Sequence, residues 1–166
     1  AERYIHRLRK GYPANFVRMG GHVYFRADHA AYGFEIWKTD GTTAGTVMVK
    51  DIHPGSSGSE AAPFGKAKNA VAFNGKLIFV ANEPSYGQEL WQSDGTPAGT
   101  VLLKDVYPGA ASSFASYFEI IDGRLFFYAN DGAHGYELWG SNGSGPGTKI
   151  VEITVESGSQ LSAHWN

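Results

Sequence analysis

One short pattern occurs three times in this chain and constrains its fold more than any other feature. It reads GFEIW at 33–37, GQELW at 87–91 and GYELW at 135–139. Each copy runs into a turn, which reads TDGT at 39–42, SDGT at 93–96 and SNGS at 141–144. A repeat of about 50 residues indicates supersecondary units that bury their apolar faces only by stacking on one another.

Each unit is predicted to begin with a β-hairpin. Two-residue turns separate alternating apolar runs in all three units, at Gly20-Gly21, Asn74-Gly75 and Asp122-Gly123. These dipeptides tolerate the positive φ angles of a type I′ turn, which is the turn that matches the twist of the flanking strands. The repeat units are therefore expected over residues 16–54, 70–108 and 117–153.

Two more strands complete each predicted unit. The third strand carries the Glu-x-Trp pattern, and a glycine-rich turn connects it to a fourth strand at 47–52 and 101–106. Pro-Gly ends the fourth strand because proline cannot continue a hydrogen-bonded ladder. The residues that recur in this pattern are interpreted as structural, with each Trp filling the space between units: Glu35, Trp37, Asp40, Glu89, Trp91, Asp94, Glu137 and Trp139.

Four antiparallel strands in each unit are typical of the blade of a β-propeller. The sequence therefore predicts an all-β, propeller-type array of three four-stranded antiparallel blades in one repeat domain. A β-trefoil, which also has three four-stranded repeats and closes within one chain, is the alternative. Propellers close with about 4–8 blades, so we expect a homodimer that closes a six-bladed ring, with 1–15 and 154–166 as edge or closure segments.

The string ELWQSDGT at 89–96, with a near copy at 35–42, resembles the bacterial ELWxxDGT repeat family. The resemblance extends to AGT at 44–46 and 98–100, and it covers the chain from Phe16 to about Glu152. It implies a secreted or surface-attached protein of propeller-like tandem repeats, and no catalytic residues go with the repeat. The third copy departs from the pattern at Asn142 and Ser144.

Composition and motifs argue against several classes of function. The net charge is -2, which gives no electrostatic reason to expect nucleic acid or an anionic membrane as partner. Cysteine is absent, so thiolate metal sites are excluded. No zincin, nucleophile-elbow or phosphate-loop motif occurs, and a Glu that recurs once in each unit is typical of a structural residue. The sequence therefore favours a protein that is not an enzyme and that needs no cofactor.

The loops between the second and third strands hold the candidate binding residues. Aromatic rings precede the recurring glycine, and oxygen-bearing side chains lie at the same register: Tyr32, Tyr86, His134, Asn82, Asn130 and Asp131. Such residues suit the face and the hydroxyls of a sugar, although packing beneath the loops explains them equally well. Their oxygens also suit Ca²⁺, but capping of turns is the favoured interpretation.

The leading hypothesis is a non-enzymatic, extracellular, propeller-type module for adhesion or assembly, which binds another protein or a copy of itself. A multivalent lectin is the alternative, because repeated weak sites suit polyvalent binding of glycans. A hydrolase ranks third. The chain begins at Ala1 without Met, so removal of a leader or excision from a longer array is expected.

Overall fold

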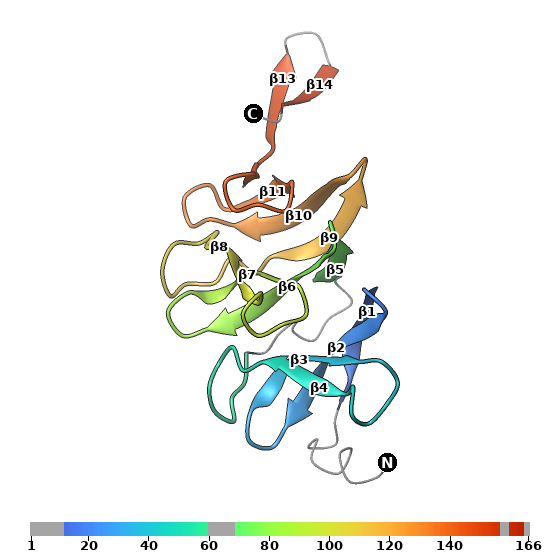
Figure 1. Cartoon of the computed structure of the whole chain (residues 1–166). Helices are drawn as coiled ribbons and strands as arrows, with labels where there is room; N and C mark the ends of the chain where they lie inside the picture. The colour runs from blue at the N-terminus through green and yellow to red at the C-terminus, as the bar shows by residue number, and fades with distance from the viewer. Residues whose placement is uncertain (1–11, 60–68, 157–159, 165–166) are drawn as a thin grey trace.

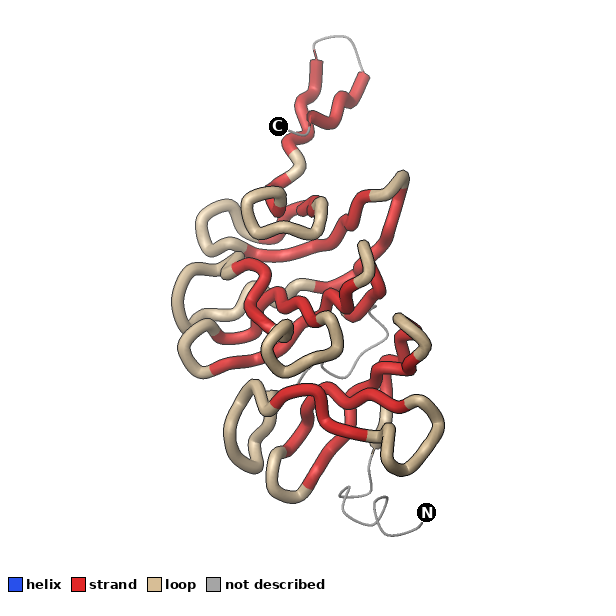
Figure 2. The backbone as a smooth tube through the Cα atoms, in the orientation of Figure 1, coloured by secondary structure: helices blue, strands red, loops and turns tan. Residues whose placement is uncertain are grey.

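The computed structural model describes residues 12–59, 69–156 and 160–164. Its strands form three four-stranded antiparallel sheets, each a meander in sequence order, and a two-stranded hairpin near the C-terminus. The sheets follow one another in layers along the chain, as Figure 1 shows by colour. Figure 2 shows that the described elements are strands joined by loops. The predicted all-β array of three four-stranded antiparallel sheets is therefore confirmed.

The first sheet contains β1 (Ala14–Met19), β2 (His22–His29), β3 (Gly33–Thr39) and β4 (Val47–Lys50). The second sheet contains β5 (Ala70–Phe73), β6 (Lys76–Glu83), β7 (Gly87–Ser93) and β8 (Val101–Lys104). The third sheet contains β9 (Ser116–Ile121), β10 (Arg124–Asn130), β11 (Tyr136–Ser141) and β12 (Thr148–Ile150). The hairpin consists of β13 (Glu152–Glu156) and β14 (Gln160–His164).

The first turn of each sheet has the predicted geometry. Both residues of each turn have positive φ, with values of 55° and 79° at Gly20 and Gly21 and 50° and 73° at Asn74 and Gly75. The third turn is the same, with φ of 49° at Asp122 and 71° at Gly123. Two consecutive residues with positive φ are the signature of the type I′ turn.

The fourth strands are shorter than predicted. The ladders end at Lys50 and Lys104 instead of continuing over 47–52 and 101–106. In the second unit the N–H of Val106 donates to a carboxylate oxygen of Glu89 at 2.8 Å, so it no longer takes part in a ladder. The corresponding run at 149–153 is also divided, because β12 ends at Ile150 and β13 begins at Glu152.

The apolar core lies between successive sheets. Alternate side chains point to opposite faces of a strand, and one face of each sheet packs against the next. Trp91 of the second sheet is buried in one cluster with Ile36 and Val49 of the first sheet. Trp139 of the third sheet is buried in another cluster that includes Leu90 of the second sheet. The tryptophans of the second and third sheets therefore each pack between their own sheet and the preceding one.

Polar contacts also join neighbouring sheets. The Lys38 Nζ donates to the carbonyl of Gly95 at 2.7 Å, and the Lys50 Nζ donates to the carbonyl of Thr100 at 2.7 Å. The Asn74 amide donates to the carbonyl of Asn142 at 3.2 Å. Side chains of one sheet thus hold the loop that follows the third strand of the next sheet.

The structure shows no closed propeller and no trefoil among the described residues, so closure into a ring stays a prediction. Most of the predicted N-terminal edge segment and residues 157–159 of the predicted C-terminal one lie outside the described residues, as do 60–68 and 165–166. Within the described ranges, no helix has the length and the apolar character needed to cross a lipid bilayer.

Candidate functional site

The loop that contains the repeated Asp-Gly-Thr is held by its own hydrogen bonds. Thr96 donates its main-chain N–H and its hydroxyl to Asp94 Oδ1, at 2.8 and 2.7 Å. The N–H of Gly99 donates to the Thr96 hydroxyl at 3.0 Å, and the Thr100 hydroxyl donates to the Thr96 carbonyl at 2.7 Å. The same bonds hold the loop of the first unit around Asp40. The side chains of Asp94, Thr96 and Thr100 therefore stabilise the conformation of their own loop.

The altered third copy of this loop keeps the same geometry. Ser144 donates its N–H and its hydroxyl to Asn142 Oδ1 at 3.0 and 2.7 Å, as Thr96 does to Asp94. The N–H of Gly147 donates to the Ser144 hydroxyl at 3.0 Å. An amide oxygen accepts these bonds as a carboxylate does. The departure at Asn142 and Ser144 therefore leaves the loop intact.

The repeated Glu accepts hydrogen bonds from a distant part of the chain. In the second unit, Glu89 is fully buried. Its carboxylate accepts from the N–H of Val106 at 2.8 Å, of Tyr107 at 3.1 Å and of Ser113 at 3.0 Å. Burial raises the pKa of Glu89 to about 7, although the hydrogen bonds from Val106 and Tyr107 oppose this. A side chain of the third strand thus holds the chain that leads out of its own unit.

Glu35 does the same in the first unit. It is fully buried and accepts from the N–H of His53 at 3.1 Å and of Ser59 at 2.8 Å. The Ser59 hydroxyl donates to the second carboxylate oxygen at 2.6 Å. Burial raises the pKa of Glu35 to about 7, and the hydrogen bonds from Ser59 and His53 act in the opposite direction.

We call residues 54–59 and 108–113 the linking segments, because each leads from one sheet toward the next. The terminal serine of each segment bridges two units. Besides its bonds to Glu35, Ser59 accepts from the N–H of Asn82 in the second sheet at 2.6 Å. Ser113 accepts in the same way from the N–H of Asn130 in the third sheet at 3.0 Å. Each of these serines thus links two successive sheets.

The glycine two residues before the Glu makes room for the linking segment. A Cβ placed on Gly33 would lie 2.5 Å from the Gly58 nitrogen, and one on Gly87 would collide with the carbonyl of Ala111. Both glycines have positive φ, of 64° and 66°. The pattern Gly-x-Glu therefore forms a binding site for main chain, which we call the seat. Its glycine allows the linking segment to approach closely, and its Glu accepts hydrogen bonds from main-chain N–H groups.

The third unit has the same seat, but nothing in the described chain fills it. A Cβ on Gly135 would meet no atom within 4 Å. Glu137 is only partly buried, and its carboxylate receives no hydrogen bond from any described residue. Beside it lies a cavity of about 350 Å³ lined by His134, Glu137, Ile150, Val151 and Glu152. The chain beyond β12 runs on into the β13–β14 hairpin, away from the third sheet (Figure 1).

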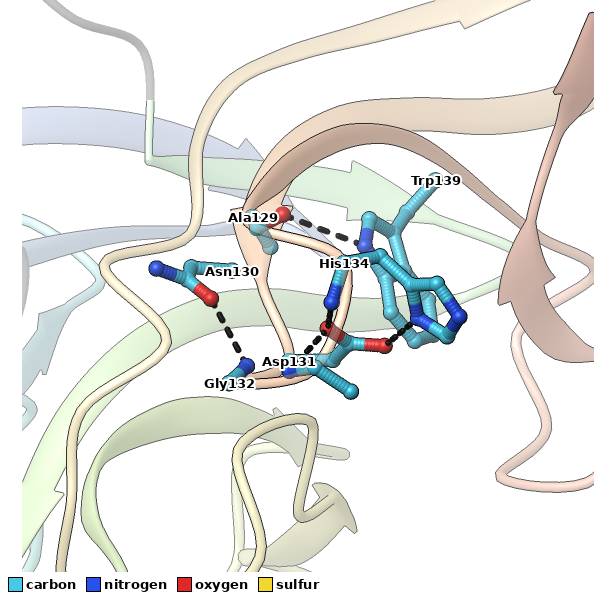
Figure 3. Close-up of polar contacts among 7 residues, drawn as sticks. Ala129, Asn130, Asp131, Gly132, His134 and Trp139 are labelled. Carbon is cyan, nitrogen blue, oxygen red and sulfur yellow. Dashed lines mark hydrogen bonds and ion pairs between the residues drawn. The ribbon is translucent and has the colours of Figure 1, made fainter.

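A hydrogen-bonded pair, Asp131 and His134, lies beside this open seat. Figure 3 shows Asp131 and His134 in the loop between β10 and β11, where His134 Nδ1 lies 2.7 Å from Asp131 Oδ2. The Asp131 Oδ1 accepts from the N–H groups of Ala133 and His134 at 2.9 and 2.8 Å. The hydrogen bond from the His134 side chain lowers the pKa of Asp131 to about 2, and Asp131 raises the pKa of His134.

The other candidate binding residues lie in different units, in or beside the loop that joins the second and third strands of each sheet. Tyr32 is 38% exposed and its ring stacks on His29 with 4.9 Å between the centroids. Tyr86 is 39% exposed in the corresponding loop of the second unit. The main-chain N–H groups of Asn82 and Asn130 donate to the serines of the linking segments. The Asn130 side-chain oxygen accepts from the N–H of Gly132 at 2.7 Å and so caps its own turn (Figure 3). No contact among the described residues brings the three loops into one site.

The outer face of the third sheet, which we define by Tyr128, Tyr136 and Leu138, was not singled out from the sequence. These side chains are 43%, 46% and 37% exposed. Val80 and Leu90 occupy the positions of Tyr128 and Leu138 in the second sheet, and both are fully buried beneath the third. A comparison of the register of the three units would have revealed this face.

No group of three or more His, Asp or Glu side chains in the described ranges lies close enough together to hold a metal ion. Comparisons with models of known protein families, with curated proteins and with solved structures found no match. The arrangement of the site itself therefore carries the functional argument.

Proposed function

We propose that this protein is a non-enzymatic binding module that acts in assembly, and that the outer face of the third sheet contacts another protein or a second copy of the chain. The observation that carries the proposal is the exposure of Tyr128, Tyr136 and Leu138 at positions that a following sheet covers in the other two units. Exposed apolar side chains grouped on one face mark interaction surfaces.

The chemistry of this face favours a protein partner. The exposed positions of this face carry two tyrosines and a leucine, and tyrosine is enriched at the centres of protein interfaces. Burial of a large aromatic side chain contributes a few kcal/mol to association.

An extracellular or surface-attached location, in a bacterium, belongs to the same proposal. It is supported by the resemblance of residues 35–46 and 89–100 to the ELWxxDGT repeat. The absence of a recognisable catalytic motif supports a role in binding. A homodimer that closes a six-bladed ring is the form of assembly that the three four-stranded sheets suggest.

Light scattering tests the proposal. The chain is expected to give a mass of about twice 17.9 kDa at high concentration. The double substitution Tyr128→Lys and Leu138→Lys is expected to return it to a monomer. Val101→Lys is the matched control, because Val101 is 40% exposed but belongs to the second sheet. A wild-type chain that remains monomeric contradicts self-association, and a dimer unaffected by the double substitution contradicts the role given to this face.

A lectin is the second candidate, and one observation favours it. The rings of Tyr128 and Tyr136 are stacked, with 5.2 Å between the centroids and an interplanar angle of 9°. Such a pair presents aromatic surface on which the apolar face of a sugar packs. Binding to immobilised polysaccharide that is competed by free sugar, and that is lost in Tyr136→Ala, would support this candidate over the first.

A further inference from the structure

The three Gly-x-Glu seats are the same in sequence but differ in occupancy. In the first two units the linking segment lies against the glycine and donates to the Glu, as Gly58 and Ser59 do at Gly33 and Glu35. In the third unit, the corresponding Gly135 has open space and Glu137 borders a cavity of about 350 Å³. The chain therefore contains two filled examples of a site and one open copy.

The filled seats define what the open one binds. Ser113 donates its N–H both to Glu89 at 3.0 Å and to the carbonyl of Gln88 at 3.1 Å, and its hydroxyl donates to the same carbonyl at 3.1 Å. In return, the N–H of Gln88 donates to the Ser112 hydroxyl at 3.0 Å. The seat thus recognises an extended main chain by hydrogen bonds along one strand, and a serine by its hydroxyl. This is recognition by main-chain pairing at an exposed strand end.

We propose that Gly135, Tyr136 and Glu137 form a binding site for an extended, serine-containing segment like residues 108–113, supplied by another chain built from the same repeat. The Tyr136 carbonyl accepts the serine hydroxyl, and the Glu137 carboxylate accepts the N–H of that serine, as Glu89 accepts the N–H of Ser113. Gly135 allows the segment to approach the strand. This inference rests on the proposed function only in that the partner is a polypeptide. The seat adjoins the outer face, because Tyr136 contributes its main-chain carbonyl to the seat and its side chain to the outer face.

A synthetic peptide with the sequence of residues 106–114 tests the site. Labelled at its N-terminus, it is titrated with the full chain and followed by fluorescence anisotropy. Binding is expected, and Glu137→Ala is expected to weaken it more than tenfold, because a hydrogen bond to a charged group is lost. Glu119→Ala is the control, since Glu119 is an exposed acid on β9 of the same sheet, and it is expected to leave binding unchanged.

The peptide supplies a second control. Methylation of the nitrogen of the residue that corresponds to Ser113 removes the N–H that Glu89 accepts in the intact chain, so this peptide is expected to bind more than tenfold more weakly. No binding of the unmodified peptide, or equal binding by wild type and Glu137→Ala, overturns the inference. The dimer test with Tyr128→Lys and Leu138→Lys is independent, so either proposal can fail without the other.

Discussion

Ser59 donates both its main-chain N–H and its hydroxyl to the carboxylate of Glu35, at 2.8 and 2.6 Å. The same serine accepts from the N–H of Asn82 in the next sheet. A buried acid of one unit is thereby joined to the backbone of the following unit through one residue. Stacking of these sheets depends on this polar contact as well as on the apolar core between them.

Ser59→Ala and Ser113→Ala are predicted to destabilise the fold. Each removes a hydroxyl that donates to a main-chain carbonyl, and Ser59→Ala also removes a donor to buried Glu35. The expected loss is about 1–2 kcal/mol in the free energy of unfolding, measured by urea denaturation. Ser57→Ala serves as the control because Ser57 is exposed. Equal stabilities for Ser57→Ala and Ser59→Ala would contradict the role given to Ser59.

Stability is predicted to fall as pH rises from about 4.5 to about 7. Burial raises the pKa of Glu35 and Glu89 from 4.5 to about 7, so the folded chain retains protons that the unfolded chain has already released. The resulting stabilisation is fully present below pH 4.5 and is lost as pH rises through 7, by about 3 kcal/mol for each carboxyl.

The midpoint of urea unfolding across this pH range measures the effect. Glu35→Gln combined with Glu89→Gln is expected to flatten the profile, because the titrating groups are gone. Glu137→Gln is the matched control and is expected to preserve the slope, because Glu137 is only partly buried. A wild-type stability that rises between pH 4.5 and 7 would contradict the prediction.

Asp94→Asn is predicted to be tolerated, whereas Asp94→Ala is predicted to lower stability, because the loop loses the two hydrogen bonds that Asp94 accepts from Thr96. The third unit already carries Asn142 at this position, and its amide oxygen accepts the same two bonds from Ser144. Gly99→Ala is expected to be the most damaging change in this loop, because a Cβ there collides with the Asp94 carboxylate. Thermal unfolding of the three variants gives the order of their stabilities. An Asp94→Asn variant that is less stable than Asp94→Ala would contradict the prediction.

His134 is predicted to titrate above its ordinary value near 6.5. The hydrogen bond and the charge of Asp131 both raise its pKa. Asp131→Asn removes the charge, so the pKa of His134 is expected to move back toward the ordinary value. Titration of the imidazole by NMR measures both. A His134 that titrates identically in the two proteins would show that the pair at 2.7 Å does not persist in solution.

Much of the fold follows from local sequence pattern. The Gly-Gly, Asn-Gly and Asp-Gly turns need only two residues with positive φ, and all three form as predicted. The predicted ends of the fourth strands were wrong. In the second unit the N–H of Val106 donates to Glu89, which lies 17 positions earlier in the chain, instead of to a neighbouring strand. Alternation of apolar residues within a strand carries no information about a contact of this range.

The candidate site was harder to predict for a related physical reason. The three Glu residues look equivalent in sequence, yet Glu35 and Glu89 are buried while Glu137 is not. The difference depends on whether a linking segment returns over the seat, as it does at Ser59 and Ser113. The exposure of Tyr128 and Leu138 similarly arises because no further sheet of the described residues covers them, and a pattern within one strand carries no information about such a long-range contact.

The most direct test compares Glu89→Ala with Glu137→Ala by urea unfolding at one pH. The two substitutions are chemically identical and affect equivalent positions of the repeat. Glu89→Ala leaves the N–H groups of Val106 and Tyr107 without their acceptor, so a loss of about 3 kcal/mol is predicted. Glu137→Ala is predicted to change stability by less than about 0.5 kcal/mol. Equal losses in the two variants would contradict the claim that the third seat is open.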